Sequence, residues 1–438
     1  MRILQLTPGS GDNFYCENCL RDAAAIKALR GLGHDAVVVP LYLPPQLEDT
    51  NPGGMDKIFF GGINVYLQQK TSLFRKTPRW IDRFFDSPKL LQWIARKAHM
   101  TNAIDLAETT LSMLRGENGR QVKELNRLIS WLQSQNKPDV FCLSNVLLSG
   151  LARQIKEQTQ VPIVCLLQDE DEFIDALPEP YRQTTWDTLR RLIPDIDQFV
   201  AVSKYYADIM QNRLSIPPDR MHVVYNGIDG SGYKPAQPTK PTIGYLSRMC
   251  PDKGLDILAD AFIILKQKEI HRDLKLCIAG GKTAADQPFV EVILKKLRES
   301  KTIKDVEFLT DFNRNVRLDF LSSLSVLSVP ERRPPACGLY ILEAWAAGVP
   351  VVQPRHGVFP ELIESGGGGI LTSANDAQTL AASLESILQD KDYAGKLGDR
   401  GRQAIMNKFN INQTAIELLE VYQQSIPTGH ENSWQGPM

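Results

Sequence analysis

The chain has 438 residues, of which 43% are hydrophobic, and a formal net charge of −1. This length predicts two domains with sizeable cores, and the balanced charge argues against a nucleic-acid-binding protein. No apolar run approaches the roughly 18 residues that a membrane span needs. Residues 1–6 have the pattern of a strand rather than of a signal peptide. We therefore expect a cytoplasmic protein.

Seven cysteines are scattered along the chain, which fits reduced thiols better than a disulfide framework. Cys16 and Cys19 form a close pair, for which a redox or metal role is open. No second Cys or His pair at ligand spacing accompanies them. The pair alone therefore does not predict a metal site.

The first half of the chain begins with a β-turn-α-β pattern. An expected strand at 2–7, a glycine-rich turn, a helix over Cys19–Leu32 and a strand at 36–39 follow one another. This arrangement predicts parallel strands with a right-handed crossover. Gly9 and Gly11 in the turn allow either a tight turn or the close approach of a phosphate or sugar.

Residues 53–135 do not continue this pattern. Within them, the stretch 75–97 is basic and aromatic. It fits a helical hairpin that packs on its own domain, and it also fits a peripheral contact with an anionic membrane or a lipid-linked acceptor. Both interpretations stay open.

The alternation of strands and helices returns at residue 138. The expected elements of this part are strands at 138–143, 161–167 and 199–203, a strand and turn over 221–229, and helices over 147–157 and from Tyr205.

A run of acids, Asp169 to Glu172, follows Gln168 at the end of the strand 161–167. Ligands of open α/β sheets collect at the carboxyl ends of strands. The acids either cap the next helix or orient acceptor hydroxyls or a metal. We expect capping for most of them, and an acceptor-site role for Asp169 or Asp171.

A polar stretch rich in Gly and Pro, residues 230–241, is the best candidate for a linker. After it the α/β pattern restarts. The expected elements are strands at 242–246, 274–279, 306–309 and 326–329, a helix over 254–267, a turn at 366–369, and helices within 376–425.

The stretch 335–352 combines a glycine loop, an apolar helix and a strand. Gly338 and Leu339 open the helix, whose first N–H groups suit an anion, and Gly348 ends it. Glu343 lies on this otherwise apolar helix. A buried carboxylate needs partners, so Glu343 either reaches solvent, pairs with an arginine or binds a ligand.

Arg248 and Lys253 follow the expected strand 242–246 at a loop-to-helix junction. The planar fork of an arginine and the point charge of a lysine together suit a diphosphate. A solvated basic pair is the alternative interpretation. Two similar α/β halves joined by a linker imply a cleft that such residues would line.

Taken together, four motifs resemble those of the family-4 retaining glycosyltransferases of the GT-B fold. They are A-V-S-K-Y-Y-A-D (201–208), V-V-Y-N-G-I-D (223–229), G-Y-L-S-R-M-C-P-D-K-G (244–254) and C-G-L-Y-I-L-E-A-W-A-A-G-V-P-V-V (337–352). The resemblance implies an α/β fold with two Rossmann-like parallel-sheet domains that face a central cleft. The implied bounds are 1–232 with a helical insertion at about 70–135, 233–408, and a helix and tail at 409–438 that return to the first domain.

The resemblance also implies roles for the candidate residues. Arg248 and Lys253 would neutralise the diphosphate of a nucleotide-sugar donor as it leaves. Glu343 would bind the donor ribose, while the N–H groups near Gly338 and Leu339 would contact sugar or phosphate. The donor would also meet Gly9 and Gly11, and Gln168, Asp169 and Asp171 are candidates for the acceptor side. The acceptor itself is a glycan, a lipid-linked molecule or a small molecule, and no metal is expected.

The chain departs from the family pattern at two positions. The first Glu of the C-terminal Glu-x7-Glu motif, which contacts hydroxyls of the transferred sugar, falls on Pro335 here, and Glu331 could replace it only if the loop 330–336 folds back. A His common in the family is replaced by Gln168, which cannot act as an acid or base. A non-catalytic relative that binds a nucleotide or glycan is therefore the second hypothesis. A Rossmann-type NAD enzyme is disfavoured, because Gly9-Ser10-Gly11 lacks the third glycine of that fingerprint.

Overall fold

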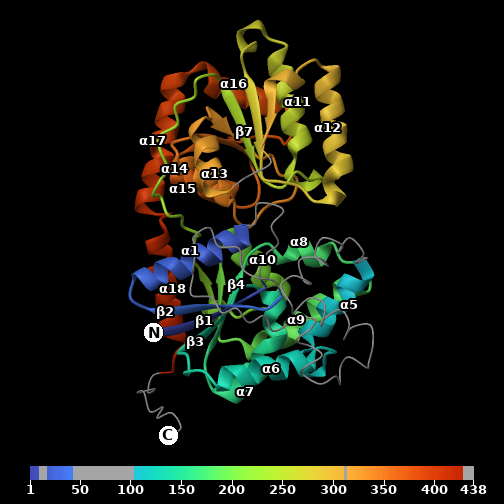
Figure 1. The fold of residues 1–438 in the computed structure, drawn as a ribbon, viewed down its shortest axis with the longest axis vertical. Coiled ribbons are helices and arrows are strands. Elements are labelled where there is room, and N and C mark those ends of the chain that lie inside the picture. Colours follow the sequence, from blue (N-terminus) through green and yellow to red (C-terminus); the bar gives the residue numbers. More distant parts are fainter. Residues whose placement is uncertain (9–16, 43–102, 310–312, 428–438) are drawn as a thin grey trace. The chain divides into compact units, whose positions relative to one another are not determined.

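The computed structural model describes residues 1–8, 17–42, 103–309 and 313–427. The glycine loop with Gly9 and Gly11, Cys16, and the basic stretch 75–97 lie outside these ranges, so the expectations for them stay predictions. The described residues form two compact units, drawn in Figure 1. One unit comprises those within Met1–Gly11, Asn18–Val224 and Ala415–Met438, and the other those within Asp12–Glu17 and Tyr225–Thr414.

The first unit contains a six-stranded parallel sheet with the order β2-β1-β3-β4-β5-β6. Its strands are β1 (Arg2–Thr7), β2 (Asp35–Pro40), β3 (Val140–Leu143), β4 (Ile163–Leu167), β5 (Gln198–Ala201) and β6 (Met221–Val223). All five residues of β4 are buried, as expected for a strand that is covered on both faces. Helices lie on both sides of this sheet (Figure 1).

The helices of the first unit lie between its strands in the chain, with one exception at the end. They are α1 (Glu17–Gly31), α5 (Ala103–Leu114), α6 (Val122–Gln133), α7 (Ala152–Thr159), α8 (Glu170–Asp175), α9 (Tyr181–Leu192), α10 (Lys204–Leu214) and most of α18 (Ile411–Ser425). The helix expected over 147–157 begins as a 3-10 helix at Val146–Leu151 and becomes α-helical at Ala152. Ser203 caps α10, because its hydroxyl accepts from the Tyr206 N–H.

The second unit contains another six-stranded parallel sheet, with the order β12-β11-β10-β7-β8-β9. Its strands are β7 (Thr242–Leu246), β8 (Lys275–Ala279), β9 (Val306–Phe308), β10 (Val326–Leu327), β11 (Val351–Pro354) and β12 (Gly369–Thr372). Its helices are α11 (Leu255–Lys266), α12 (Gln287–Glu299), α13 (Arg314–Ser322), α14 (Leu339–Ala346), α15 (Phe359–Gly366), α16 (Ala377–Gln389) and α17 (Lys391–Asn407).

The α/β class and the two parallel sheets predicted from the sequence are confirmed. The stretch 230–241 contains neither helix nor strand, yet it is attached to the second unit. Tyr233 is buried, and the N–H groups of Ala236 and Gln237 donate to the carbonyls of Ala347 and Ser322. Within the described ranges, no helix combines the length and the apolarity that crossing a bilayer requires.

The helix α14 is anchored in the second unit by Trp345, whose side chain is completely buried. Its indole N–H donates to the Gly368 carbonyl at 2.9 Å. The helix α17 approaches the same ring at Gly401, where a methyl carbon would lie 2.6 Å from Trp345 Cδ1. Close packing at this point therefore requires a residue without a side chain.

This contact predicts that Gly401→Ala lowers the free energy of unfolding by about 1–3 kcal/mol, the usual cost of overpacking. Gly395→Ala on the same helix is the matched control, because nothing lies within 4 Å of the added methyl group. The control is expected to be neutral or to stabilise by up to about 1 kcal/mol, since alanine is the better helix former. Urea denaturation of both variants measures the difference, and equal effects would contradict the packing argument.

Candidate functional site

The strand order of the second sheet marks the place where a ligand is expected. When its strands are numbered from 1 to 6 in chain order, their order across the sheet is 3-2-1-4-5-6. The direction of the numbering therefore reverses between β7 and β10. In open α/β sheets, ligands bind outside the carboxyl ends of the strands at such a switch point. Arg248 and Lys253 follow β7, and Glu331 follows β10. The sequence candidates for diphosphate binding therefore lie at the switch point of this sheet.

Lys253 forms an ion pair at this edge that the sequence did not reveal. Its ammonium donates to Glu331 Oε2. The Glu331 side chain is 2% exposed, against 21% for Lys253. The hydroxyl of Tyr340 donates to the other carboxylate oxygen, Oε1, at 2.8 Å. Glu331 thus joins the turn after β7 to the helix α14.

The loop that carries Glu331 is fastened on several sides. The Glu331 carbonyl accepts hydrogen bonds from His356 Nε2 at 2.9 Å and from Asn375 Nδ2 at 2.7 Å. Its neighbour Arg332 donates through its backbone N–H to the Asp252 carbonyl and pairs with Asp256. The loop after β10 is therefore held against the turn that bears Lys253.

Arg248 also faces a carboxylate. Its Nε and Nη2 atoms donate to the two oxygens of Asp286 at 2.9 and 3.0 Å. Although burial raises the pKa of Asp286, the hydrogen bonds from Arg248 and from Thr283 lower it below its usual value. The Tyr245 hydroxyl donates to the Arg248 carbonyl at 2.8 Å and lies 3.5 Å from the Lys253 carbonyl. Tyr245 therefore links the backbone of the two cationic residues.

Glu343 lies one helical turn beyond Tyr340 on α14 and is 2% exposed. Its Oε1 accepts from Arg317 Nε at 2.7 Å and from the Tyr233 hydroxyl at 2.8 Å. The sequence left three alternatives for Glu343: solvent, an arginine or a ligand. The structure shows the pairing with an arginine. Gly338 caps the start of α14 with φ = 109°, a conformation that favours glycine.

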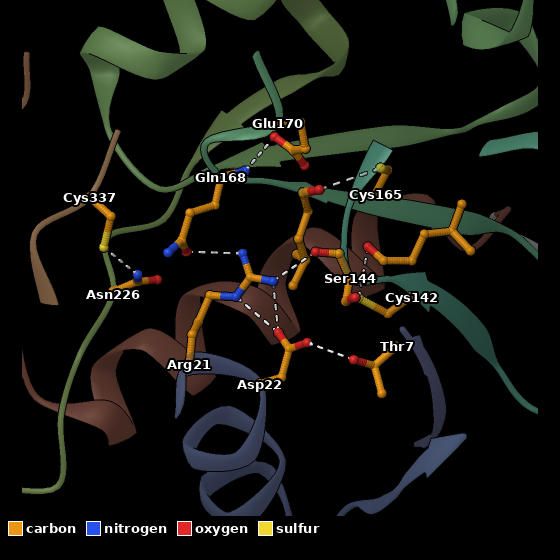
Figure 2. A network of polar contacts seen from close by, with 12 residues as sticks. Thr7, Arg21, Asp22, Cys142, Ser144, Cys165, Gln168, Glu170, Asn226 and Cys337 are labelled. Atoms are coloured by element: carbon orange, nitrogen blue, oxygen red, sulfur yellow. Dashed lines mark hydrogen bonds and ion pairs between the residues drawn. The ribbon is translucent and has the colours of Figure 1, made fainter. Parts of the chain in front are cut away.

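The first unit holds a second buried polar cluster, shown in Figure 2. Arg21, 5% exposed, donates through Nε and Nη2 to Asp22 Oδ1 at 2.9 and 2.7 Å. Its Nη2 also donates to the Ser144 carbonyl at 2.7 Å, and Thr7 Oγ1 lies 3.4 Å from Asp22 Oδ2. Thr7 ends β1 and Ser144 follows β3. These neighbouring strands flank the point where the order of the first sheet reverses.

Gln168 is oriented by this cluster. Arg21 Nη1 donates to Gln168 Oε1 at 3.1 Å (Figure 2). Turning the amide over would place its NH₂ group against the guanidinium, donor against donor. The backbone N–H of Gln168 donates to Glu170 Oε2 at 2.8 Å. The acceptor-side candidate Gln168 is therefore fixed in both backbone and side chain.

The acids after β4 have distinct places. Asp169 is the N-cap of α8 with φ = 59°, but its side chain makes no capping hydrogen bond. The Asp171 N–H lies 3.3 Å from the Tyr206 hydroxyl. The buried acid is Glu170, which accepts from the Val146 N–H and from the Tyr206 hydroxyl. Burial raises the pKa of Glu170, and the hydrogen bond from Tyr206 opposes that shift.

Sequence reasoning gave no individual role to several charged residues of these clusters. Among them are Arg21, Asp22, Glu170, Asp286 and Arg317. The burial of Arg21 and Asp22 could have been predicted, because they lie one turn before Ala25 and Ile26 on the apolar face of α1. Within the described part of the chain, no group of three or more His, Cys, Asp and Glu side chains is placed to hold a metal ion.

Two protein-family models match successive parts of the chain. The model described as Glycosyltransferase Family 4 matches residues 23–231, and the model described as Glycosyl transferases group 1 matches residues 233–404. Together they span most of the sequence. The second match contains Arg248, Lys253, Glu331 and Glu343.

Curated relatives are distant. The chain is 26% identical over 268 residues to alpha-maltose-1-phosphate synthase of Mycolicibacterium smegmatis. This alignment covers 56% of this chain and 67% of the relative. The chain is 24% identical over 260 residues to D-inositol 3-phosphate glycosyltransferase of Nocardia farcinica. This alignment covers 57% of this chain and 57% of the relative. The chain thus spans from just over half to two thirds of the length of these relatives.

Solved structures resemble the whole chain. Sucrose-phosphate synthase from Thermosynechococcus elongatus has a TM-score of 0.71 at 16% identity, covering 97% of this chain and 98% of the other. HepE from Anabaena in complex with UDP and glucose has a TM-score of 0.69 at 17% identity, covering 97% and 99%. These likenesses show the GT-B fold.

The buried pair of Arg317 and Glu343 predicts a specific loss of stability. Arg317→Met leaves the Glu343 carboxylate buried without its ion partner, which costs about 3–5 kcal/mol. Arg314→Met on the same helix removes a hydrogen bond from an exposed side chain to the Ser231 carbonyl and a cation–π contact with the Tyr233 ring, at a cost of about 1–2 kcal/mol in all. Urea denaturation at pH 7 compares the two, and similar losses would contradict the role given to the buried pair.

The lowered pKa of Asp286 predicts a pH dependence. A carboxyl whose folded pKa lies below its unfolded pKa stabilises the fold above the unfolded value, about 3.9, and loses this contribution as the pH falls through the folded value. Asp286→Asn is therefore expected to lower the melting temperature at pH 7, and the gap to the unchanged protein should narrow below about pH 4. A difference in melting temperature that grows towards acid pH would contradict this prediction.

Proposed function

Because this chain belongs to the glycosyltransferases, as its matches to the family 4 and group 1 models show, we propose that it transfers a hexose-type sugar from a nucleoside-diphosphate donor to an acceptor with retention of the anomeric configuration. The observation that carries this proposal is the placement of Arg248 and Lys253 at the switch point of the second sheet. Their charges would stabilise the leaving diphosphate.

The remaining residues take supporting roles in this proposal. Glu343 binds the donor ribose, and Arg317 orients its carboxylate through Oε1. The N–H groups near Gly338 and Leu339 open α14 and suit an anion, as helix N-termini do. The Leu339 N–H donates to the Glu17 carboxylate at 3.0 Å, and the donor would take the place of this carboxylate. Gln168 contacts the acceptor side through its amide, with Asp169 and Asp171 nearby in the chain. In this proposal no metal takes part, and Arg248 and Lys253 are the cations that meet the diphosphate.

The choice of donor starts from the solved relatives. HepE has been solved with UDP and with UDP-glucose, which makes the UDP-sugars the first donors to test. The acceptor is a glycan, a lipid-linked molecule or a small molecule. Peripheral membrane contact through residues 75–97 stays a prediction.

A second candidate function is a non-catalytic relative that binds a nucleotide or a glycan. Pro335 has no side-chain acceptor, and Gln168 cannot exchange a proton. Tight nucleotide binding without turnover would support this candidate. Activity gained in Pro335→Glu would then show which contact had been missing.

The enzyme proposal predicts turnover of at least one of UDP-, GDP- and ADP-glucose. Arg248→Ala and Lys253→Ala should each lower kcat by about 10²-fold or more, the usual effect of removing one group that stabilises developing charge. Lys268→Ala is the matched control, because its ammonium pairs with Glu385 at an exposed position. NMR of the product reports its anomeric configuration, and turnover in the presence of EDTA tests the metal-free mechanism.

No hydrolysis or transfer of any of the three donors by folded protein would remove the enzyme proposal. Equal losses in Arg248→Ala and in Lys268→Ala would remove the proposed site.

A further inference from the structure

The start of α14 already holds an anion that belongs to the protein itself. Gly338, the N-cap of this helix, has no side chain that could accept a hydrogen bond from the first turn. The Leu339 N–H donates instead to Glu17 Oε1 at 3.0 Å, across 322 positions of the chain. Both residues belong to the second unit. A carboxylate therefore occupies the place that suits the phosphate of a ligand.

The surroundings of α14 make a negative charge at this place valuable. All eight residues of the helix are buried, so little water screens the partial positive charge at its start. A carboxylate near such a helix end is stabilised more than one at an exposed helix end. The hydrogen bond from Leu339 therefore holds Glu17 in the free protein.

Glu17 and a phosphate cannot use the Leu339 N–H together. One backbone N–H has a single hydrogen to donate, and two anions side by side repel one another. A diphosphate that reaches the start of α14 has to displace Glu17. Its measured affinity is then the difference between its own contacts and the contact that Glu17 loses.

The displaced carboxylate has a second favourable place. Glu17 is half-buried, so its side chain can leave Leu339 without entering an apolar core. It is also the first residue of α1 and lies in the first turn of that helix, where the partial positive charge of the helix end stabilises an acid. Displacement of Glu17 therefore costs one contact and leaves no buried, uncompensated charge.

We propose that Glu17 is a competitor of the donor built into the chain: its carboxylate holds the start of α14 in the free protein and weakens the binding of every ligand whose phosphate takes its place. The nucleoside diphosphate left by the reaction is such a ligand, and the return of Glu17 to Leu339 favours its release, a step that limits the rate of many enzymes. This inference rests on the proposed function, because it takes the diphosphate to contact α14.

Titration calorimetry with UDP, GDP and ADP tests the competition. For the diphosphate that binds, Glu17→Gln should raise the affinity about tenfold, in the range that one charge contributes at a partly buried helix N-terminus. Asp390→Asn is the matched control, because it removes the same charge from another helix start of the second unit. Asp390 caps α17 at an exposed position, where it accepts from the Tyr393 N–H at 2.9 Å, and its loss should leave the affinity unchanged.

Thermal unfolding separates competition from a merely structural role. Without ligand, Glu17→Gln should lower the melting temperature slightly, because the start of α14 loses its charged partner. At a fixed concentration of the diphosphate, the variant should gain more in melting temperature than the unchanged protein, since tighter binding stabilises the folded state further. A purely structural residue would lower the melting temperature and bring no gain in affinity.

A second variant covers the case in which Glu17→Gln does not fold. Glu17→Asp keeps the charge in the first turn of α1 but shortens the side chain by one methylene group, so it should raise the affinity by a smaller factor. An affinity that is unchanged or lower in Glu17→Gln, or in Glu17→Asp where only that variant folds, overturns the inference and leaves the proposed function intact. If neither variant folds, Glu17 is a structural residue and the inference falls as well. If the unchanged protein and both variants bind none of the three diphosphates, the proposed function fails, and this inference fails with it.

Discussion

The second unit contains buried carboxylates, and its stability depends on the cations that pair with them. Three cations, Lys253, Arg248 and Arg317, each contact a carboxylate that is almost fully buried. A charge buried in this way is costly unless it is paired and hydrogen-bonded. Each pair therefore fixes the geometry of its own two partners, and a ligand of one of these cations has to compete with a carboxylate of the protein.

The parallel sheets explain why such groups meet. In each unit the carboxyl ends of the strands share one edge, and the strand order reverses near its middle. The loops after β7, β8 and β10 bring Arg248, Asp286 and Glu331 to the same edge of the second sheet. The Arg21 cluster takes the corresponding place in the first sheet, between the ends of β1 and β3 (Figure 2). Topology therefore gathers residues that are far apart in the chain.

Much of this architecture could be predicted from the sequence, because strands and helices are set by local patterns. The strand β7 has the predicted bounds, and α14 begins at the predicted glycine loop. The cationic candidates were also recognisable, since they stand in a loop directly after a buried strand. Family assignment followed from the order of the motifs and is confirmed by the two family models.

The partners of the site residues could not be predicted, because pairing across a sheet edge is not local. Glu331 is 78 residues from Lys253, and Asp286 is 38 residues from Arg248. From the sequence, Glu331 could replace the missing motif Glu only if the loop 330–336 folds back. Its contacts with Tyr340 and Lys253 could not be predicted. The burial of Arg21 was missed because charged side chains on helices are usually solvated.

The contact between Arg21 and Gln168 limits which side chains can replace Gln168. An imidazole introduced at position 168 would face the permanently positive guanidinium of Arg21, which disfavours its protonation, while the carboxylates of Asp22 and Glu170 in the same cluster favour it. The proton affinity of a histidine at this position would therefore be set by the charges of this cluster. Positions 21 and 168 have to be exchanged together, with Asp22 adjusted to the new charge, and the two residues should vary jointly among close homologues.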